Sequence, residues 1–169
     1  MDMKVLVAYA SKRGATAEIA RKIGEVLRQE GLDVDVVPAK QVSNPEEYQA
    51  VIIGSAAYMG MWRKEAVNLL KNNEKLLSER AVWIFSSGPT GEGDPVELVQ
   101  GWRFPKAQQP IIERIKPRDI AVFHGKLDPD TMNFFEKAII KNVKSAIGDF
   151  RDWNAITAWA KDIAKALKK

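Results

Sequence analysis

The amino-acid sequence predicts an α/β fold, with an open parallel sheet of five strands between two layers of helices. Short apolar runs without alternation, which are typical of strands covered on both faces, recur along the chain. Segments with apolar residues at helical spacing lie between these runs. Strands that alternate with helices along one chain are expected to be parallel and joined by crossover helices. With 169 residues, we expect a single domain over residues 1–169.

Five segments carry the strand pattern. Four of them are nearly continuous apolar runs, and the second in chain order alternates between apolar and acidic residues. The predicted strands are Lys4–Ala10, 32–37, 50–54, 81–85 and 119–123. Counted along the chain, we expect the strand order 2-1-3-4-5, with helices on both faces of the sheet.

Helical periodicity fills the segments between the strands. The first helix, Ala15–Gln29, ends before Gly31, a common stop signal. A second helix is predicted over 63–77. Residues 96–109 have weak periodicity and are predicted to form a long, partly helical excursion, with one or two helical turns at 110–115 after it.

The last third of the chain contains two more predicted helices. Residues 131–147 carry an apolar stripe with lysines beside it, which we interpret as core packing, with a membrane-facing side as the alternative. Residues 148–151 break this helix, and Asp152 is expected to cap the final one.

The composition limits the kinds of site and reaction that the side chains can provide. Hydrophobic residues make up 46% and charged residues 28% of the chain, as in ordinary globular proteins, and there is no cysteine. This excludes disulfides, iron–sulfur clusters and cysteine nucleophiles, so redox chemistry would need a bound cofactor. We expect no metal site.

The net charge and the hydropathy limit the classes of binding partner that we expect. The formal net charge is +4, but no basic run is interleaved with aromatic residues, so we expect no nucleic-acid partner. We see no signal peptide, and no apolar run approaches the ~18–20 residues that a membrane span needs. The expected location is the cytoplasm, with peripheral attachment at the inner face of the membrane left open.

The loop after the first strand is suited to hold a phosphate. It reads Ser11, Lys12, Arg13, Gly14, Ala15, Thr16. The N–H groups of the first helical turn have no partner inside the helix, and the helix dipole adds partial positive charge there. Backbone donors suffice for a phosphate, so the two basic side chains are expected to be solvated. The alternative is an ordinary loop in which Ser11 or Thr16 caps the helix.

Two further strand ends are suited to a flat aromatic ring. The residues concerned are Ser55, Ala56, Ala57, Tyr58 and Trp62 after the third strand, and Ser86, Ser87, Gly88 and Gly91 after the fourth. In parallel sheets these loops lie side by side at the carboxyl edge, where ligands bind. A phosphate beside a planar ring describes FMN.

Several roles remain open within this group. At least one of Tyr58 and Trp62 is expected to touch the ring, although either could instead anchor its loop. Gly88 and Gly91 are turn residues, ring contacts, or both. His124, the only histidine, is expected to be structural rather than an acid or base. We predict no essential catalytic side chain.

The pattern resembles the flavodoxins over the whole chain, which implies a flavodoxin-like three-layer sandwich. The spacing Ser11-x-x-Gly14-x-Thr16 is similar to the family's hydroxyl-x-x-Gly-x-Thr phosphate loop. Residues 53–60 resemble the Ile-Gly-Ala-Ser-Ile-x-Tyr-Gly stretch of the menaquinone-dependent protoporphyrinogen IX dehydrogenase branch. Residues 124–129 with the basic helix after them, and Asp152-Trp153, are also similar to that branch.

The resemblance to this branch implies FMN as cofactor, a quinone as electron acceptor, and a membrane-associated tetrapyrrole substrate in heme biosynthesis. Electron transfer between redox partner proteins, with no substrate of its own, is the alternative function. The basic net charge counts modestly against this alternative, because carriers of this fold are typically acidic. A third interpretation is a degenerate site on a fold that only binds other proteins.

Overall fold

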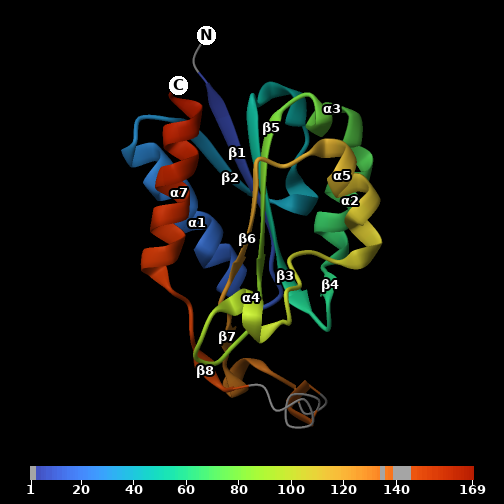
Figure 1. The fold of residues 1–169 in the computed structure, drawn as a ribbon, viewed down its shortest axis with the longest axis vertical. Helices are drawn as coiled ribbons and strands as arrows, with labels where there is room; N and C mark the ends of the chain where they lie inside the picture. The colour runs from blue at the N-terminus through green and yellow to red at the C-terminus, as the bar shows by residue number, and fades with distance from the viewer. Residues whose placement is uncertain (1–2, 134–135, 139–145) are drawn as a thin grey trace.

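The computed structural model describes residues 3–133, 136–138 and 146–169. Five parallel strands form the main sheet, in the order β2-β1-β3-β5-β6 (Figure 1). They are β1 (Lys4–Ala10), β2 (Asp33–Pro38), β3 (Ala50–Tyr58), β5 (Ala81–Ser87) and β6 (Asp119–Phe123). This is the predicted order 2-1-3-4-5. The short strand β4 (Met61–Trp62) pairs antiparallel with the end of β3.

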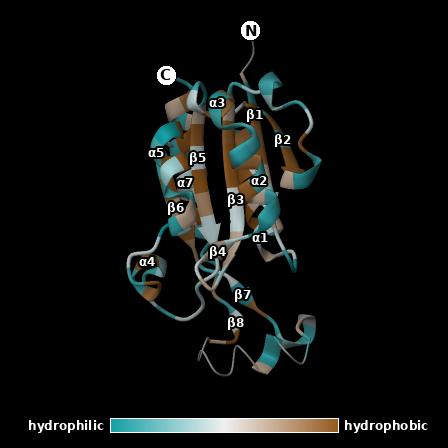
Figure 2. Cartoon of the chain, turned by 90° about the vertical axis from the view of Figure 1, so that its right-hand side faces the viewer, coloured by the Kyte–Doolittle hydropathy of each residue, from teal (hydrophilic) through white to brown (hydrophobic). Residues whose placement is uncertain are grey.

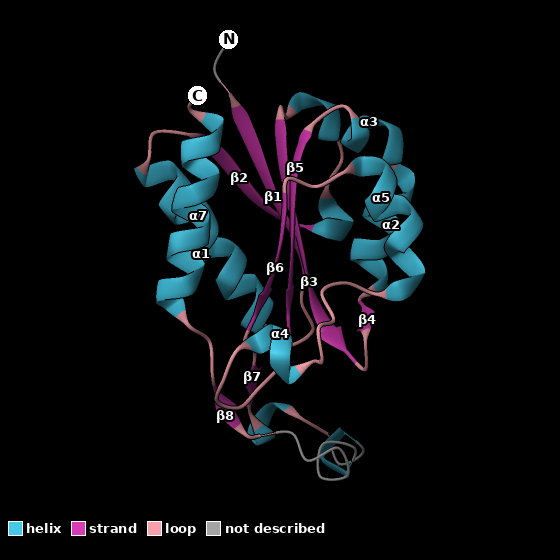
Figure 3. Ribbon diagram, viewed as in Figure 1, coloured by secondary structure: helices cyan, strands magenta, loops and turns pink. Residues whose placement is uncertain are grey.

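Helices cover both faces of this sheet, so the predicted three layers are confirmed (Figure 3). The helices α1 (Ala15–Gln29) and α7 (Trp153–Leu167) lie on one face. The other face carries α2 (Lys64–Asn72), α3 (Glu74–Ser78) and α5 (Gln109–Ile115). The short helix α4 (Pro95–Leu98) belongs to the excursion that follows β5.

The core consists of two apolar layers, one on each side of the sheet. Figure 2 shows that the strands between these layers are themselves mostly hydrophobic. Along β1, Val5 and Val7 pack toward α1 and α7, whereas Leu6 and Ala8 pack toward α2. Burial of both strand faces removes apolar surface from water on both sides. It also explains why β1 is a continuous apolar run rather than an alternating one.

An aromatic cluster stands behind the carboxyl half of the sheet. The ring centroids of Phe85, Phe123 and Trp159 lie 5.5–6.0 Å apart, in tilted and edge-to-face arrangements. The indole Nε1 of Trp159 donates a hydrogen bond of 2.8 Å to Asp119, which fixes α7 on the edge strand. Gly54 leaves room for this cluster, because a Cβ on Gly54 would lie 1.9 Å from the Phe85 ring.

Two predicted elements differ markedly from the structure, and the strand predicted over 81–85 runs two residues further, to Ser87. The helix expected over 63–77 is broken into α2 and α3 at Asn73, whose side-chain amide donates to the carbonyl of Leu69. The third strand does not stop at Gly54 but continues to Tyr58, because its backbone stays paired with β5 as far as Ala56 and with β4 beyond it. The final helix is capped as predicted, since Asp152 accepts from the N–H of Ala155.

The excursion between β6 and α7 differs from the prediction where it is described. Two short strands that the sequence did not predict, β7 (Lys126–Leu127) and β8 (Gly148–Asp149), pair antiparallel below the main sheet (Figure 1). Most of the helix expected over 131–147 lies outside the described residues. Within that range, Met132 and Asn133 are not helical, and residues 136–138 are. No helix in the described ranges has the length and apolar character to cross a membrane.

Replacing Gly54 with alanine should destabilise the protein. The added methyl group overlaps the Phe85 ring, and overpacking of a core costs about 1–3 kcal/mol. Urea unfolding followed by circular dichroism would measure the loss. In a Phe85→Leu background, the same Gly54→Ala change should cost less, because the smaller side chain leaves space. An unchanged unfolding midpoint for Gly54→Ala would contradict this packing.

Candidate functional site

The carboxyl ends of β1, β3, β5 and β6 meet at one edge of the sheet, at the lower end in Figure 1. Backbone hydrogen bonds join two of these ends: the N–H of Gly88 donates to Phe123, and the N–H of Gly125 donates to Pro89. The loops predicted to form one site are therefore neighbours in space.

Glycines allow these loops to approach one another. A Cβ on Gly88 would lie 2.7 Å from the carbonyl oxygen of Ala57, and a Cβ on Gly125 would lie 2.9 Å from the carbonyl oxygen of Gly88. Both distances are shorter than real Cβ contacts. The structure therefore gives Gly88 a close approach to the end of β3, whereas Gly91 has a φ of +112°, a turn conformation that favours glycine.

The loop Ser11–Thr16 ends on a helix without a side-chain cap. Gly14, with a φ of +92°, is the N-cap of α1, and it makes no side-chain capping hydrogen bond. The hydroxyl of Ser11 accepts from the N–H of Gly14 at 3.0 Å, so it closes a local turn within the loop. Thr16 is buried in the first helical turn. By contrast, α7 begins with the side-chain cap Asp152.

Lys12 and Arg13 are exposed, as expected, but they also form ion pairs. The ammonium of Lys12 lies 3.0 Å from the carboxylate of Glu136, and the guanidinium of Arg13 contacts the same carboxylate oxygen. Glu136 belongs to the excursion between β6 and α7, and 124 positions separate it from Lys12. The sequence contains no local signal for this contact.

The segment 55–62 is a β-hairpin. Tyr58 pairs with Met61, and the two residues between them, Met59 and Gly60, both have positive φ, as a type I′ turn requires. The tip exposes large apolar side chains: the exposed fractions of Tyr58, Met59 and Met61 are 51%, 70% and 65%.

Three of the predicted site side chains are bonded inside the protein. The indole of Trp62 is 7% exposed, and its Nε1 donates to the hydroxyl of Ser86 at 2.8 Å. Ser86 in turn donates to the carbonyl of Arg103. The hydroxyl of Ser55 accepts from the N–H of Arg63 at 3.0 Å and donates to the carbonyl of Ala56. These bonds hold the hairpin against the end of β5.

The remaining predicted residues lie along the facing strand ends. Ala56 pairs with Ser87 in the parallel register of β3 and β5, and Ala57 pairs with Trp62 across the hairpin. Ser87 is buried. The excursion after β5 packs beneath these ends, because Trp102 and Phe104 contact the core layer on the α2 side. These two aromatics are therefore partly buried packing residues.

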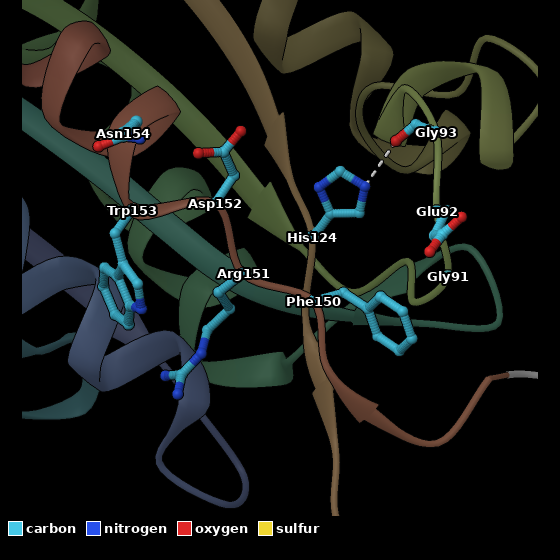
Figure 4. A pocket seen from close by; sticks show the side chains of 9 residues that line it. All are labelled: Gly91, Glu92, Gly93, His124, Phe150, Arg151, Asp152, Trp153 and Asn154. Atoms are coloured by element: carbon cyan, nitrogen blue, oxygen red, sulfur yellow. Dashed lines mark hydrogen bonds between the residues drawn. The ribbon is translucent and has the colours of Figure 1, made fainter.

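His124 fastens the glycine-rich loop after β5. Its Nε2 donates to the carbonyl of Gly93 at 2.7 Å. Below it lies an open hollow of about 530 Å³, lined by the loop 91–93, His124 and residues 150–154. Figure 4 shows the side chains of His124 and Asp152 at this hollow, while the guanidinium of Arg151 points away toward α1. The structural role expected for His124 agrees with its bond to Gly93.

Arg151 connects the segment between β6 and α7 to the first turn of α1. It forms a bidentate pair with Asp149 at 2.8 and 2.9 Å, and it donates to the carbonyl of Ala15 and to the carboxylate of Glu18. Its side chain is only 4% exposed. The hydrogen bonds from Arg151 lower the pKa of Asp149, and the same pair raises the pKa of Arg151. Sequence reasoning missed Arg151 and Glu136, because both act across more than 120 positions.

The residues at this edge fit FMN. A 15-residue helix presents its first turn without a side-chain cap, beside a glycine whose Cβ position is open space. Such a helix end binds phosphate through its N–H groups and its dipole. The neighbouring hairpin exposes Tyr58, which offers an aromatic face to a ring. Among the described residues, no group of three or more His, Asp or Glu side chains gathers as a metal site would need.

Known proteins are similar to this chain over its full length. The protoporphyrinogen IX dehydrogenase [quinone] of Escherichia coli (strain K12) is 22% identical over 188 residues, an alignment covering 99% of this chain and 98% of the relative. A flavodoxin from the domain Archaea superposes with a TM-score of 0.65 at 17% identity, covering 99% of this chain and 100% of that one. A flavodoxin from Streptococcus pneumonia TIGR4 superposes with a TM-score of 0.61 at 16% identity, covering 96% and 99%.

The structural similarities show the fold, and the family follows from the sequence. A model of the family described as flavodoxin domain matches residues 6–154, which is most of the chain. Membership of this family implies FMN as the cofactor, in agreement with the fit of the strand-end loops. The chain therefore belongs to the flavodoxin domain family of FMN redox proteins.

Proposed function

We propose that this protein is an oxidoreductase that passes electrons from protoporphyrinogen, through bound FMN, to a quinone. The choice of this substrate rests on the end-to-end alignment with the E. coli protoporphyrinogen IX dehydrogenase [quinone]. That alignment includes the excursion between β6 and α7, which provides the hollow below His124. Bound FMN supplies the redox-active ring, since the chain has no cysteine and thus no thiol of its own.

The first loop is proposed to hold the phosphate of FMN. The N–H groups of Ala15 and Thr16 in the first turn of α1 would donate to it, where the helix dipole favours an anion. The N–H of Gly14 is bonded to the Ser11 hydroxyl, so it would have to exchange this partner to take part. The hydroxyls of Ser11 and Thr16 add side-chain donors, and Lys12 and Arg13 add positive charge.

The second and third loops are proposed to hold the ring. Ala56, Ala57, Ser87, Gly88 and Gly91 offer backbone N–H and carbonyl groups to its edge. A backbone carbonyl of these loops would accept a hydrogen bond from an N–H of the reduced ring, and no essential catalytic side chain is proposed. Ser55 and Ser86 already have partners inside the protein, which supports a role for them in shaping the loops.

Tyr58 is proposed as the aromatic residue that covers the ring. Its side chain is half exposed at the hairpin, whereas Trp62 is buried and bonded to Ser86. An exposed ring is free to pack face to face with a flat ligand, and a buried one already packs in the core. Trp62 would then contribute indirectly, because its hydrogen bond to Ser86 holds the hairpin in place.

A second candidate function is electron transfer between protein partners. The exposed side chains of Tyr58, Met59 and Met61 favour it, because apolar side chains at the rim of a cofactor site are suited to contact another protein. The same surface would suit a peripheral contact with a membrane. The net charge of +4 counts modestly against this second function, because electron carriers of this fold are typically acidic.

Removing the hydroxyls of the phosphate loop should weaken FMN binding. In a Ser11→Ala, Thr16→Val double variant the volume of Thr16 is kept, and FMN affinity should fall by about 10- to 100-fold, because hydrogen bonds to a charged group are lost. Riboflavin has no phosphate, so its affinity should stay unchanged. Quenching of flavin fluorescence measures both constants. Equal FMN affinities for variant and parent would mean that the phosphate binds elsewhere.

Removing the ring of Tyr58 should weaken FMN and riboflavin alike. An aromatic pair contributes about 0.5–1.5 kcal/mol, so Tyr58→Ala should lower both affinities by about 3- to 10-fold and shift the visible flavin absorbance. Met59→Ala is the matched control, because Met59 is the exposed neighbour at the same tip. Losses of equal size in both variants would argue against ring stacking by Tyr58.

A turnover assay separates the two candidate functions. The protein loaded with FMN should oxidise protoporphyrinogen in the presence of a menaquinone analogue, with porphyrin fluorescence as the readout. The control contains free FMN at the same concentration without protein. A rate no higher than this control would exclude the dehydrogenase and leave the electron carrier. A colourless protein that takes up no added FMN would exclude both functions.

A further inference from the structure

The two basic side chains of the phosphate loop share one counter-ion from a distant segment. Glu136 contacts Lys12 and Arg13 through the same carboxylate oxygen. The side chain of Glu136 is 18% exposed, so most of it is covered by the surrounding protein. A carboxylate here occupies the charged groups that an incoming phosphate would attract.

The local backbone fixes the position of Glu136. Its N–H donates to the side chain of Asn133 at 2.8 Å, and the N–H of Lys137 donates to the Asn133 carbonyl at 3.1 Å. The side chain and the carbonyl of Asn133 thus accept from two consecutive backbone N–H groups, those of Glu136 and Lys137. These bonds hold the backbone that presents the carboxylate of Glu136 to the phosphate loop.

We propose that Glu136 competes with the phosphate of the cofactor for Lys12 and Arg13. This inference rests on the proposed phosphate site in the loop Ser11–Thr16. While Glu136 holds both cations, a phosphate gains only the backbone donors and hydroxyls of the loop and is repelled by a nearby like charge. When the phosphate takes over the cations, Glu136 is released, and Asn133, which is bonded to the backbone of Glu136, is no longer held to the loop through it.

The other charges near the loop do not supply this effect. Arg151, Asp149 and Glu18 bond to one another beside the first turn of α1, and none of their hydrogen bonds involves Lys12. If Glu136 only tethered the phosphate loop to the segment between β6 and α7, a neutral side chain at this position would change the FMN affinity in the opposite direction. Loss of a tether would loosen the loop and weaken cofactor binding, whereas loss of a competitor strengthens it.

The test compares FMN and riboflavin binding by the full-length apoprotein and its Glu136→Gln variant. Two unit charges about 4 Å apart interact by about 1 kcal/mol in water, so the variant should bind FMN about 3- to 10-fold more tightly. Riboflavin affinity should not change. Glu113→Gln is the matched control: it makes the same charge change on α5, in the other helix layer, and should leave both affinities unchanged.

Hydrogen exchange gives a second readout. FMN should speed exchange of the amides at 129–133 in the parent protein, and riboflavin should not, because only the phosphate releases Glu136. Unchanged or weaker FMN binding by Glu136→Gln would overturn the proposal, and so would slower exchange at 129–133 on addition of FMN. If the Ser11→Ala, Thr16→Val variant also binds FMN like the parent, then the phosphate site itself is misplaced.

Discussion

The close approach of backbones at Gly88 is the contact on which the rest of this site depends. A side chain at this position would overlap the carbonyl of Ala57, and a side chain at Gly125 would overlap the carbonyl of Gly88. Next to these contacts, the hydrogen bonds from Gly88 to Phe123 and from Gly125 to Pro89 join the ends of β5 and β6. The ends of β3, β5 and β6 therefore approach one another through backbone alone, at the edge where the loops for a phosphate and a ring are expected.

Elements that the local sequence determines were predicted well. The bounds of β1 and α1 match the apolar run and the helical spacing, because burial of both faces of the strand and one face of the helix leaves a direct trace in the sequence. The hairpin at 55–62 was missed because its first half, Ser55-Ala56-Ala57-Tyr58, resembles a loop. Its extension depends on pairing with β5 and on an uncommon positive φ at Met59.

Side-chain roles were harder to predict than loop positions. From the sequence, Tyr58 and Trp62 were equivalent candidates for the ring. The burial of Trp62 and its bond to Ser86 distinguish them in the structure. The contacts of Arg151 and Glu136 with the first loop join residues more than 120 positions apart, and a single sequence carries no trace of such pairs. Their residue types alone suggest solvated charges.

The segment between β6 and α7 contacts the phosphate loop through Glu136 and the start of α1 through Arg151, and these two contacts differ in chemistry. The side chain of Arg151 is buried, makes a bidentate pair with Asp149 and also bonds to backbone, so breaking this contact would leave a buried guanidinium unpaired. The contact of Lys12 with Glu136 is a partly exposed ion pair, which contributes little stability and exchanges its partner readily. The excursion is therefore anchored firmly next to α7 and held by an exchangeable contact in its middle. In such an arrangement the cofactor phosphate can act on the middle of the excursion without disturbing its attachment to the fold.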